Sequence, residues 1–360
     1  MLIRIDNIII NNNFIKLNNF LNKPNISKIV ILLDNKIKKF CLNILYKYLS
    51  KNIKKKITLI NISFGEKNKN LKTCIYIWRI LIKKKIDKNS IIINLGGGVI
   101  TDLGGFISSL FKRGIKFINI PTTLLGMVDA SIGGKNGINF LKLKNEIGII
   151  KKPINIYINY KFLKTLPDKE IISGFGEILK YGLIYDKKYW NYIKKINIHN
   201  IEKIKNKDWK RIIYKAVEIK NKIVKKDPFE LLGYRKILNF GHTIGHALES
   251  FFLLKKHPIT HGEAILLGMI CESWISYKKG MLKEKEYKEI LSTILKFVKI
   301  KIIKKKYFKN ILDFIGNDKK NLNNKIYFVL LNKIGASKFN IIINKNLIKK
   351  SIINMNNLKN

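Results

Sequence analysis

The stretch that decides the fold is IIINLGGGVITDLGGF, residues 91–106. Its first five residues have the isoleucine-rich character of a buried strand, which stops at the glycines 96–98. Residues 100–111 continue with helical length and periodicity. A strand that runs through glycines into a helix places them at the carboxyl end of the strand, where open α/β sheets bind ligands.

Three further runs have the same strand character: residues 29–33, 57–62 and 117–120. Residues 71–85 have the length and spacing of a helix. Continuous apolar strands separated by helices are typical of a parallel sheet that is covered on both faces. We therefore expect an α/β, Rossmann-like nucleotide-binding domain over residues 1–157.

The second half of the chain has a different pattern. Residues 208–226 and 261–279 have the spacing of amphipathic or buried helices. Two late apolar runs, 325–331 and 338–343, predict a single pair of strands. We expect a mainly α-helical domain over residues 158–360.

The 71 lysines and arginines against 24 aspartates and glutamates give a formal net charge of +47. A charge of this size often indicates a nucleic-acid or membrane partner. Here the basic residues are spread through every segment together with isoleucine and asparagine. A binding footprint is patchy instead, with arginines and aromatic residues interleaved. We therefore expect a solvated basic surface and no dedicated nucleic-acid partner.

The three cysteines, Cys41, Cys74 and Cys271, are far apart and form no CxxC pair. Their number and spacing exclude a disulfide framework and a cysteine-based zinc module, and fit a reducing compartment. The N-terminus has no continuous apolar segment of the signal-peptide kind, and no run of about 18 apolar residues predicts a membrane span. We expect a soluble, cytoplasmic protein.

The glycines at 96–98 would let a phosphate approach the backbone, and the helix that follows supplies unpaired N–H groups and the positive end of its dipole. The dinucleotide fingerprint G-x-G-x-x-G would need a glycine at Thr101, so a simple turn stays open as an alternative. A second glycine-rich stretch, DASIGGKNG at residues 129–137, is predicted to be a loop. It carries a carboxylate and the Lys135 ammonium, a compact charge that suits phosphate.

Histidine clustering is the clearest sign of a metal site. Four of the five histidines fall within twenty residues: His242, His246, His257 and His261. His242 and His246 are four residues apart, which puts both imidazoles on one helix face, a common geometry for a metal pair. The candidates for a third ligand are Glu177, Glu249, His261 and Glu263.

Nine stretches together carry a family resemblance. They are residues 96–106 (GGGVITDLGGF), 113–114 (RG), 121–125 (PTTLL), 128–129 (VD), 131–135 (SIGGK), 144–145 (KN), 177–182 (EILKYG), 238–247 (LNFGHTIGHA) and 261–264 (HGEA). In this order they resemble the 3-dehydroquinate synthase family, the sugar phosphate cyclases of the shikimate pathway. Many short motifs in one order are far more specific than any of them alone.

The resemblance implies an NAD-binding α/β domain, a helical domain that binds Zn²⁺ or Co²⁺, and a homodimer. It implies the metal ligands Glu177, His242 and His261, which makes His246 a histidine that acts on the substrate and replaces the pair inferred from spacing. The implied NAD contacts are Asn35, Glu66, Lys69, Gly97, Gly98, Asp102, Thr122, Thr123, Lys144, Phe162, Leu163, Lys164 and Thr165. The implied substrate contacts are Asp129, Lys135, Asn145, Lys180, Lys220, Arg235, Asn239, His246, a late lysine (Lys319 or Lys320) and Arg113, which reaches the site of the partner subunit.

The activity that the resemblance implies is that of a phosphorus–oxygen lyase. The family converts 3-deoxy-D-arabino-heptulosonate 7-phosphate to 3-dehydroquinate and phosphate. NAD oxidises one alcohol transiently, phosphate leaves by β-elimination, the hydride returns, the ring opens, and an aldol step closes the carbocycle. Arg235 would bind the carboxylate, and Lys135 with Asn239 the phosphate. The metal would polarise the hydroxyl that is oxidised.

The chain departs from the family pattern at four places. Phe64 stands where the family has an aspartate, Asn136 where a threonine is usual, and Lys222 where an acidic residue is usual. Residues 227–230 (DPFE) replace a more charged segment. The first departure concerns the adenosine side of NAD, and the last two concern the edge of the substrate site.

Three alternatives stay open at this point. A metal- and NAD-dependent polyol dehydrogenase would not need Lys135, Lys180, Lys220 and Arg235 around a dianionic substrate. A sister cyclase that acts on another sugar phosphate is poorly separated by sequence. A basic nucleic-acid-binding protein would bind with a steep dependence on salt.

Overall fold

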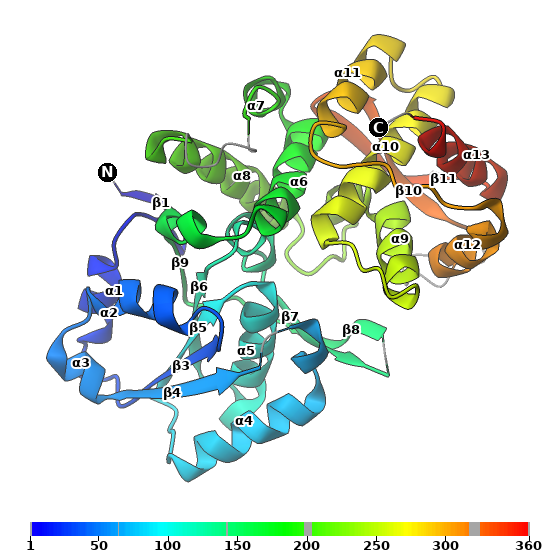
Figure 1. Ribbon diagram of the computed structural model, residues 1–360. Helices are drawn as coiled ribbons and strands as arrows, with labels where there is room; N and C mark the ends of the chain where they lie inside the picture. The colour runs from blue at the N-terminus through cyan, green and yellow to red at the C-terminus, as the bar shows by residue number, and fades with distance from the viewer. Residues whose placement is uncertain (1, 64, 142, 198–203, 317–324, 359–360) are drawn as a thin grey trace. The chain divides into compact units, whose positions relative to one another are not determined.

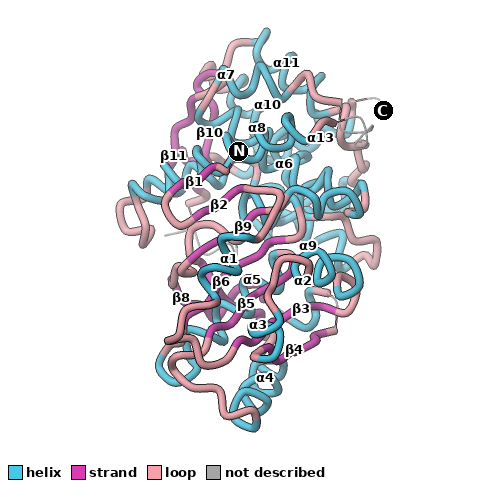
Figure 2. The backbone as a smooth tube through the Cα atoms, turned by 90° about the vertical axis from the view of Figure 1, so that its left-hand side faces the viewer, coloured by secondary structure: helices cyan, strands magenta, loops and turns pink. Residues whose placement is uncertain are grey.

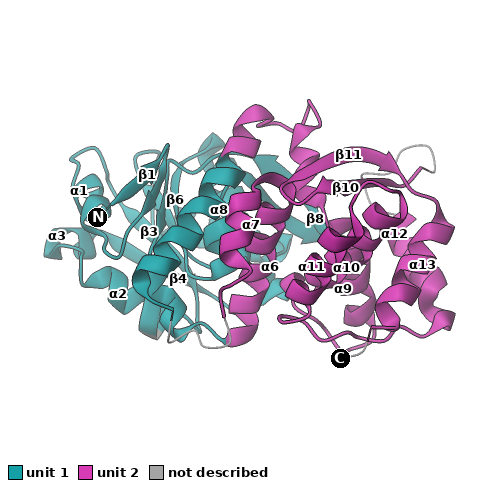
Figure 3. Ribbon diagram, turned by 90° about the horizontal axis from the view of Figure 1, so that it is seen from above, with its two compact units in different colours: residues 1–167, 201–221 teal, residues 168–200, 222–360 magenta. Residues whose placement is uncertain are grey.

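The computed structural model describes residues 2–63, 65–141, 143–197, 204–316 and 325–358, and the chain folds into two compact units. Residues 1–167 and 201–221 form unit 1, and residues 168–200 and 222–360 form unit 2 (Figure 3). The sequence placed its boundary at 157/158. The division lies ten residues later in the structure because residues 160–165 form a short 3-10 turn that packs with unit 1, and the first part of a later helix also belongs to that unit.

Unit 1 is built on a sheet whose strands follow the order β1-β2-β9-β6-β5-β3-β4, visible as one continuous set in Figure 2. All neighbours are parallel except β1 and β2. The strand bounds, in sheet order, are Ile3–Ile5, Ile8–Ile10, Asn155–Ile158, Lys116–Pro121, Ile91–Gly96, Ile29–Asp34 and Ile57–Ile62. The strands predicted at 29–33, 57–62, 91–95 and 117–120 are therefore confirmed as β3, β4, β5 and β6.

Both faces of this sheet are covered, because every residue of β3 and of β5 is buried. On one face, Val30 and Ile92 pack in a cluster with Ile77 of α4 and Leu103 of α5. Each fully buried side chain of this kind contributes about 1.5–3 kcal/mol. The helices and short turns of this unit are α1 (Ile15–Leu21), η1 (Lys38–Leu42), α2 (Asn43–Tyr46), α3 (Lys51–Lys55), η2 (Glu66–Asn68), α4 (Leu71–Lys83), α5 (Gly98–Leu110), η3 (Phe111–Arg113), η4 (Gly126–Ala130) and η5 (Tyr160–Thr165).

The stretch predicted as a glycine-rich loop at 129–137 is only partly a loop. Lys135 begins β7 (Lys135–Phe140), which pairs antiparallel with β8 (Leu143–Ile150). The prediction failed here because glycine is rare in strands, so the glycine-rich sequence indicated a loop. Asn136 holds the start of this hairpin, since its side-chain amide donates to the carbonyl oxygens of Gly134 and Lys151, both at 2.8 Å.

Unit 2 is mainly helical and is organised around α10 (His261–Lys278), whose side chains are buried nearly all round. Four other helices pack against α10 (Figure 1): α6 (Asp168–Tyr185), α9 (His242–Leu254), α11 (Glu284–Ile294) and α13 (Lys345–Asn356). The remaining elements are α7 (Lys187–Ile193), η7 (Tyr234–Asn239), η8 (Lys305–Tyr307), α12 (Phe308–Gly316) and the antiparallel pair β10 (Tyr327–Lys333) and β11 (Ala336–Ile342). Helix α8 (Asn206–Lys226) belongs to unit 1 up to residue 221. The predicted helices and the late strand pair are confirmed, and with them the fold class.

Among the helices of the described residues, none combines the length and the apolar character that crossing a bilayer requires. Cys41, Cys74 and Cys271 are buried and form no disulfide.

Candidate functional site

Five of the residues expected to bind NAD directly follow the carboxyl ends of β3, β5 and β6. The two strands that follow β3 in the chain, β4 and β5, pair with opposite edges of β3. The strand order therefore reverses between β3 and β5. Such a reversal is where open α/β sheets bind ligands. Asn35 follows β3, and Gly97 and Gly98 follow β5.

The first turn of α5 begins at these glycines. Gly97 is its N-cap residue and makes no side-chain cap. The Ile100 and Thr101 N–H groups donate to the Gly97 carbonyl, so the N–H groups of Gly98 and Val99, ahead of them at the helix end, are the ones that suit an anion. Thr122 and Thr123 follow β6 beside it, and the Thr122 N–H donates to the Gly96 carbonyl at 3.0 Å. The Thr122 hydroxyl is buried and has no hydrogen-bond partner among the described residues. A buried hydroxyl of this kind is suited to a hydrogen bond with a ligand group.

A second polar cluster of unit 1 surrounds Lys69. Its buried ammonium lies 2.6 Å from Asp102 Oδ2 and 2.5 Å from Asn145 Oδ1. The Glu66 carboxylate accepts a hydrogen bond from Asn139 at 2.8 Å, and the Asn145 N–H donates to the side-chain oxygen of Asn139 at 2.9 Å. The structure therefore brings together Glu66, Lys69 and Asp102, expected at NAD, with Asn145, expected at the substrate.

Asp129 and Lys220, both expected at the substrate, form an ion pair within unit 1. Lys135 is exposed at the start of β7, and Lys144 is exposed in β8. Phe162 and Leu163 are buried, and Phe162 packs on Phe14 with ring centroids 6.0 Å apart. Their side chains belong to the core, which leaves the backbone and the exposed Lys164 and Thr165 to contact a nucleotide.

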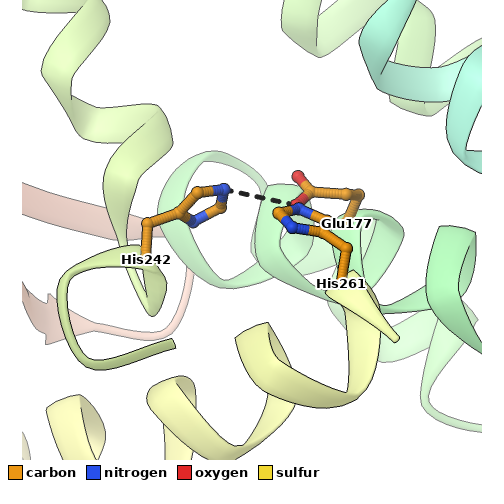
Figure 4. A group of neighbouring side chains, drawn as sticks. All are labelled: Glu177, His242 and His261. Carbon is orange, nitrogen blue, oxygen red and sulfur yellow. Dashed lines mark hydrogen bonds and ion pairs between the residues drawn. The ribbon is translucent and has the colours of Figure 1, made fainter. Parts of the chain in front are cut away.

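In unit 2, Glu177, His242 and His261 converge from α6, α9 and α10 (Figure 4). Glu177 Oε1 lies 3.4 Å from His242 Nε2 and 3.3 Å from His261 Nε2. The other carboxylate oxygen of Glu177 pairs with the buried ammonium of Lys180. The three ligands implied by the resemblance therefore lie together, although Glu177 is far from the histidines in sequence.

The chemistry of these donors fits a divalent metal. His242 Nδ1 lies 3.1 Å from the Phe240 carbonyl oxygen. A carbonyl can only accept, so in the neutral ring Nδ1 carries the proton and Nε2 turns its lone pair toward the Glu177 carboxylate. Two acceptors that face each other at 3.4 Å are accommodated by a cation between them. One carboxylate and two imidazoles are a usual donor set for Zn²⁺ with an open coordination position.

His261 also interacts with a second carboxylate, because its Nδ1 lies 3.6 Å from Glu249 Oε2. Burial lowers the pKa of His261, but hydrogen bonding to Glu177 and Glu249 and their negative charges outweigh it and raise the pKa to about 9. His246 lies beside this group, with its ring centroid 5.1 Å from that of His242. Glu263, a candidate ligand from the sequence, instead closes a capping box with Thr260 at the start of α10.

Arg235 and Asn239 lie in η7, between α8 and α9. Asp227, a residue that the sequence analysis did not single out as a site residue, organises this turn by accepting hydrogen bonds from the Leu232 and Arg235 N–H groups at 3.1 and 3.2 Å. The buried guanidinium of Arg235 donates to the Pro228 carbonyl at 3.2 Å. Asn239 lines a small hollow with Thr243 and Tyr327.

Three expectations have no full counterpart here. Lys319, Lys320 and Phe64 lie outside the described residues. Arg113 is exposed, with a left-handed backbone (φ 63°), and its role toward a partner subunit stays a prediction.

Two solved synthases share this architecture. The 2-epi-5-epi-valiolone synthase of Streptomyces hygroscopicus subsp. jinggangensis, solved with NAD⁺ and Zn²⁺, superposes with a TM-score of 0.84 at 21% identity, over 98% of this chain and 97% of that one. A 2-deoxy-scyllo-inosose synthase complexed with carbaglucose-6-phosphate, NAD⁺ and Co²⁺ gives 0.83 at 21% identity, over 98% and 99%. Both synthases share the fold of this chain.

Sequence comparison is more specific. Family models described as 3-dehydroquinate synthase N-terminal and C-terminal match residues 59–173 and 174–321. The 3-dehydroquinate synthase of Parabacteroides distasonis is 36% identical over 337 residues, 94% of each chain. The chain belongs to the 3-dehydroquinate synthase family. This membership confirms the resemblance and favours a cyclase over a polyol dehydrogenase.

Proposed function

We propose that this chain is a phosphorus–oxygen lyase that uses NAD and a divalent metal to convert 3-deoxy-D-arabino-heptulosonate 7-phosphate to 3-dehydroquinate and phosphate. The observation that carries the proposal is the convergence of Glu177, His242 and His261, whose facing acceptor atoms fit a cation. When bound, the metal would polarise a substrate hydroxyl, and NAD would take up and return one hydride.

The chain's own residues bind and orient the substrate in this proposal. The Arg235 guanidinium binds the substrate carboxylate as a fork, which a lysine could not reproduce. Lys135 and Asn239 bind the phosphate. Asp129 and Lys220 hold their charges in a fixed pair, and His246, beside the metal ligands, is the side chain that moves a proton at the reacting carbon. Lys180, Asn145, Arg113 and Lys319 complete the proposed set.

The NAD contacts are proposed at the carboxyl ends of β3, β5 and β6 and around Lys69. The N–H groups at the start of α5 would bind the pyrophosphate, and the buried Thr122 hydroxyl would gain a partner. A homodimer, a cytoplasmic location and the absence of a dedicated nucleic-acid partner stay predictions; the free buried cysteines support a reducing compartment.

The test is a phosphate-release assay. Purified protein with Zn²⁺ or Co²⁺ should release one phosphate per turnover from the heptulosonate phosphate with NAD in catalytic amount and no steady accumulation of NADH. Glucose 6-phosphate is the matched control because it carries a phosphate but no carboxylate for Arg235. Phosphate release from glucose 6-phosphate alone would favour a sister cyclase. Stoichiometric NADH formation from glycerol, without phosphate release, would favour a dehydrogenase.

A further inference from the structure

Both histidines of the metal group occupy the same kind of position. His242 is the first residue of α9, and His261 is the first residue of α10. The N-terminus of a helix carries roughly half a positive charge from the aligned peptide dipoles. A divalent cation beside two such ends is disfavoured unless negative charge offsets them.

At α10 the positive end of the helix is offset by a carboxylate of the same helix. Thr260 caps the helix, and Glu263 in its first turn accepts a hydrogen bond from the Thr260 N–H at 2.8 Å. This is a complete capping box, with a carboxylate at the positive end of the helix.

At α9 the compensation comes from another helix. The N-cap residue of α9 is Gly241, which has no side chain and a left-handed backbone (φ 78°). The carboxylate of Glu272, on α10, takes the place of a cap: its oxygens accept hydrogen bonds from the Gly241 N–H at 2.7 Å and the Ile244 N–H at 3.2 Å. These two N–H groups lie on either side of His242.

The contact between the two helices is close enough to bring Glu272 into reach. A Cβ on Gly268, one turn before Glu272 on α10, would lie 2.0 Å from the Gly241 carbonyl oxygen, so only glycine fits there. Glu272 itself is fully buried. A buried carboxylate is costly unless hydrogen bonds and charge satisfy it, and the N-terminus of α9 supplies both.

We propose that Glu272 is a positioning residue of the metal site. Its carboxylate fixes the first turn of α9, and thereby His242, and its charge offsets the positive end of that helix so that a divalent cation can bind. The proposal rests on the proposed metal site of Glu177, His242 and His261. The same helix, α10, thus provides one ligand and holds another.

The test is Co²⁺ affinity, measured by equilibrium dialysis and by the visible absorption of bound Co²⁺. Glu272→Gln keeps the size of the side chain but loses the charge and turns an amide NH₂ toward one of the two N–H groups. We expect a loss of affinity of roughly 10- to 100-fold, the range for groups that orient metal ligands. At saturating Co²⁺ the absorption spectrum and phosphate release should recover.

The matched control is Cys271→Ala. Cys271 is the neighbour of Glu272 and equally buried, but its thiol contacts the Ser351 carbonyl and the Met355 sulfur of α13. It should change thermal stability without changing Co²⁺ affinity. If Glu272→Gln does not fold, Glu272→Asp, which keeps the charge with a shorter reach, replaces it and should bind Co²⁺ more weakly than the unmodified protein.

Equal Co²⁺ affinity of the unmodified protein and a folded Glu272 variant would overturn the proposal and leave the carboxylate with a structural role only. Failure of the unmodified protein to bind Co²⁺ would overturn the proposed metal site instead. The two failures are therefore distinguishable.

Discussion

Lys220 donates hydrogen bonds to two acceptors of Asp129: its Nζ lies 2.6 Å from the backbone carbonyl oxygen and 2.5 Å from Oδ1. The lysine comes from α8 and the aspartate from η4, 91 residues earlier. Lys220 is buried, and Asp129 is partly exposed. The pair therefore joins a late helix to the loops after β6 and places one carboxylate and one ammonium in a fixed geometry.

Breaking this pair should affect stability and activity together. Lys220→Met removes the ammonium and leaves the Asp129 carboxylate without that hydrogen bond, at a cost of about 1.5–3 kcal/mol. The double variant Lys220→Met/Asp129→Asn should lose less free energy of unfolding than the two single variants together. The second change removes the carboxylate charge that the first change leaves without a partner ammonium. Denaturant unfolding measures this difference, and phosphate release should fall in each variant. Additive stability losses would show that the contact contributes nothing as a pair.

The glycine at the start of α5 gives a second prediction. A Cβ on Gly98 would lie 3.1 Å from the Ala130 Cβ, and the two further methyl groups of Gly98→Val would add to this crowding at the start of α5, where the proposed NAD site brings the pyrophosphate to the backbone. We expect NAD affinity to fall at least about tenfold, since overpacking by a few methyl groups costs 1–3 kcal/mol. Isothermal titration with NAD measures the change.

The control for this change is Gly316→Ala, at a glycine with open space around it. It should keep NAD affinity, and Co²⁺ binding by unit 2 should be unchanged in both variants. Unchanged NAD affinity in Gly98→Val would mean that residues 96–98 are a simple turn, the alternative that the sequence left open.

A third prediction concerns the carboxylate of the substrate. Arg235→Lys keeps a positive charge but loses the planar fork, so binding of a carboxylate should weaken roughly 10- to 100-fold, as for a charged hydrogen bond. The loss should appear in KM for the heptulosonate phosphate. Lys236→Arg, a change at the exposed neighbour, is the control and should leave KM unaltered. An equal KM for the unmodified protein and Arg235→Lys would remove Arg235 from the carboxylate site.

Chelation provides a fourth prediction. Removal of the metal should abolish phosphate release, and Zn²⁺ or Co²⁺ should restore it. His242→Ala should weaken metal binding by more than about 100-fold, because it removes a metal ligand, whereas a Glu272 variant removes only a group that orients a ligand. His257→Ala, which changes an exposed histidine of the same cluster, should bind metal normally. Full activity of rigorously metal-free His242→Ala protein would contradict the proposed mechanism.

The sequence predicted those parts of the fold that depend on local pattern. The strands β3 to β6 are long isoleucine-rich runs, which can be recognised one at a time. The short strands β1, β2 and β9 have three or four residues each, and they exist because they pair with one another and with β6. The hairpin of β7 and β8 escaped prediction for a related reason: its two strands satisfy each other's backbone, whereas its sequence is rich in glycine and asparagine.

For the site, too, local sequence pattern predicted some residues and missed those that depend on contacts between helices. His242 and His261 stood out because histidine is rare in this chain. The spacing favoured His242 and His246 as a metal pair, with Glu177 among the candidates for a third ligand. The family resemblance implied Glu177, His242 and His261 instead, and the structure brings these three together. Glu272 was missed although one signal existed, a carboxylate in the middle of the apolar part of α10. Its role depends on the approach of α9 to α10, and no spacing within the sequence reports that contact.

The last prediction is a pH dependence of metal binding. The pKa of His261 is raised above its ordinary value of 6.5 to about 9 when no metal is present. Because the folded-state pKa is higher than the unfolded one, the proton stabilises the metal-free fold fully below pH 6.5, and this contribution is lost as the pH rises to 9. A metal ion needs the lone pair that this proton occupies. Co²⁺ affinity should therefore rise by about tenfold per pH unit up to the pKa and then level off.

In Glu249→Gln one of the two carboxylates that raise the pKa of His261 is neutral, so the Co²⁺ affinity should level off at a lower pH. Equilibrium dialysis over this range measures both curves, and a Co²⁺ affinity that does not change between pH 6.5 and 9 in the unmodified protein would show that metal binding displaces no proton from His261.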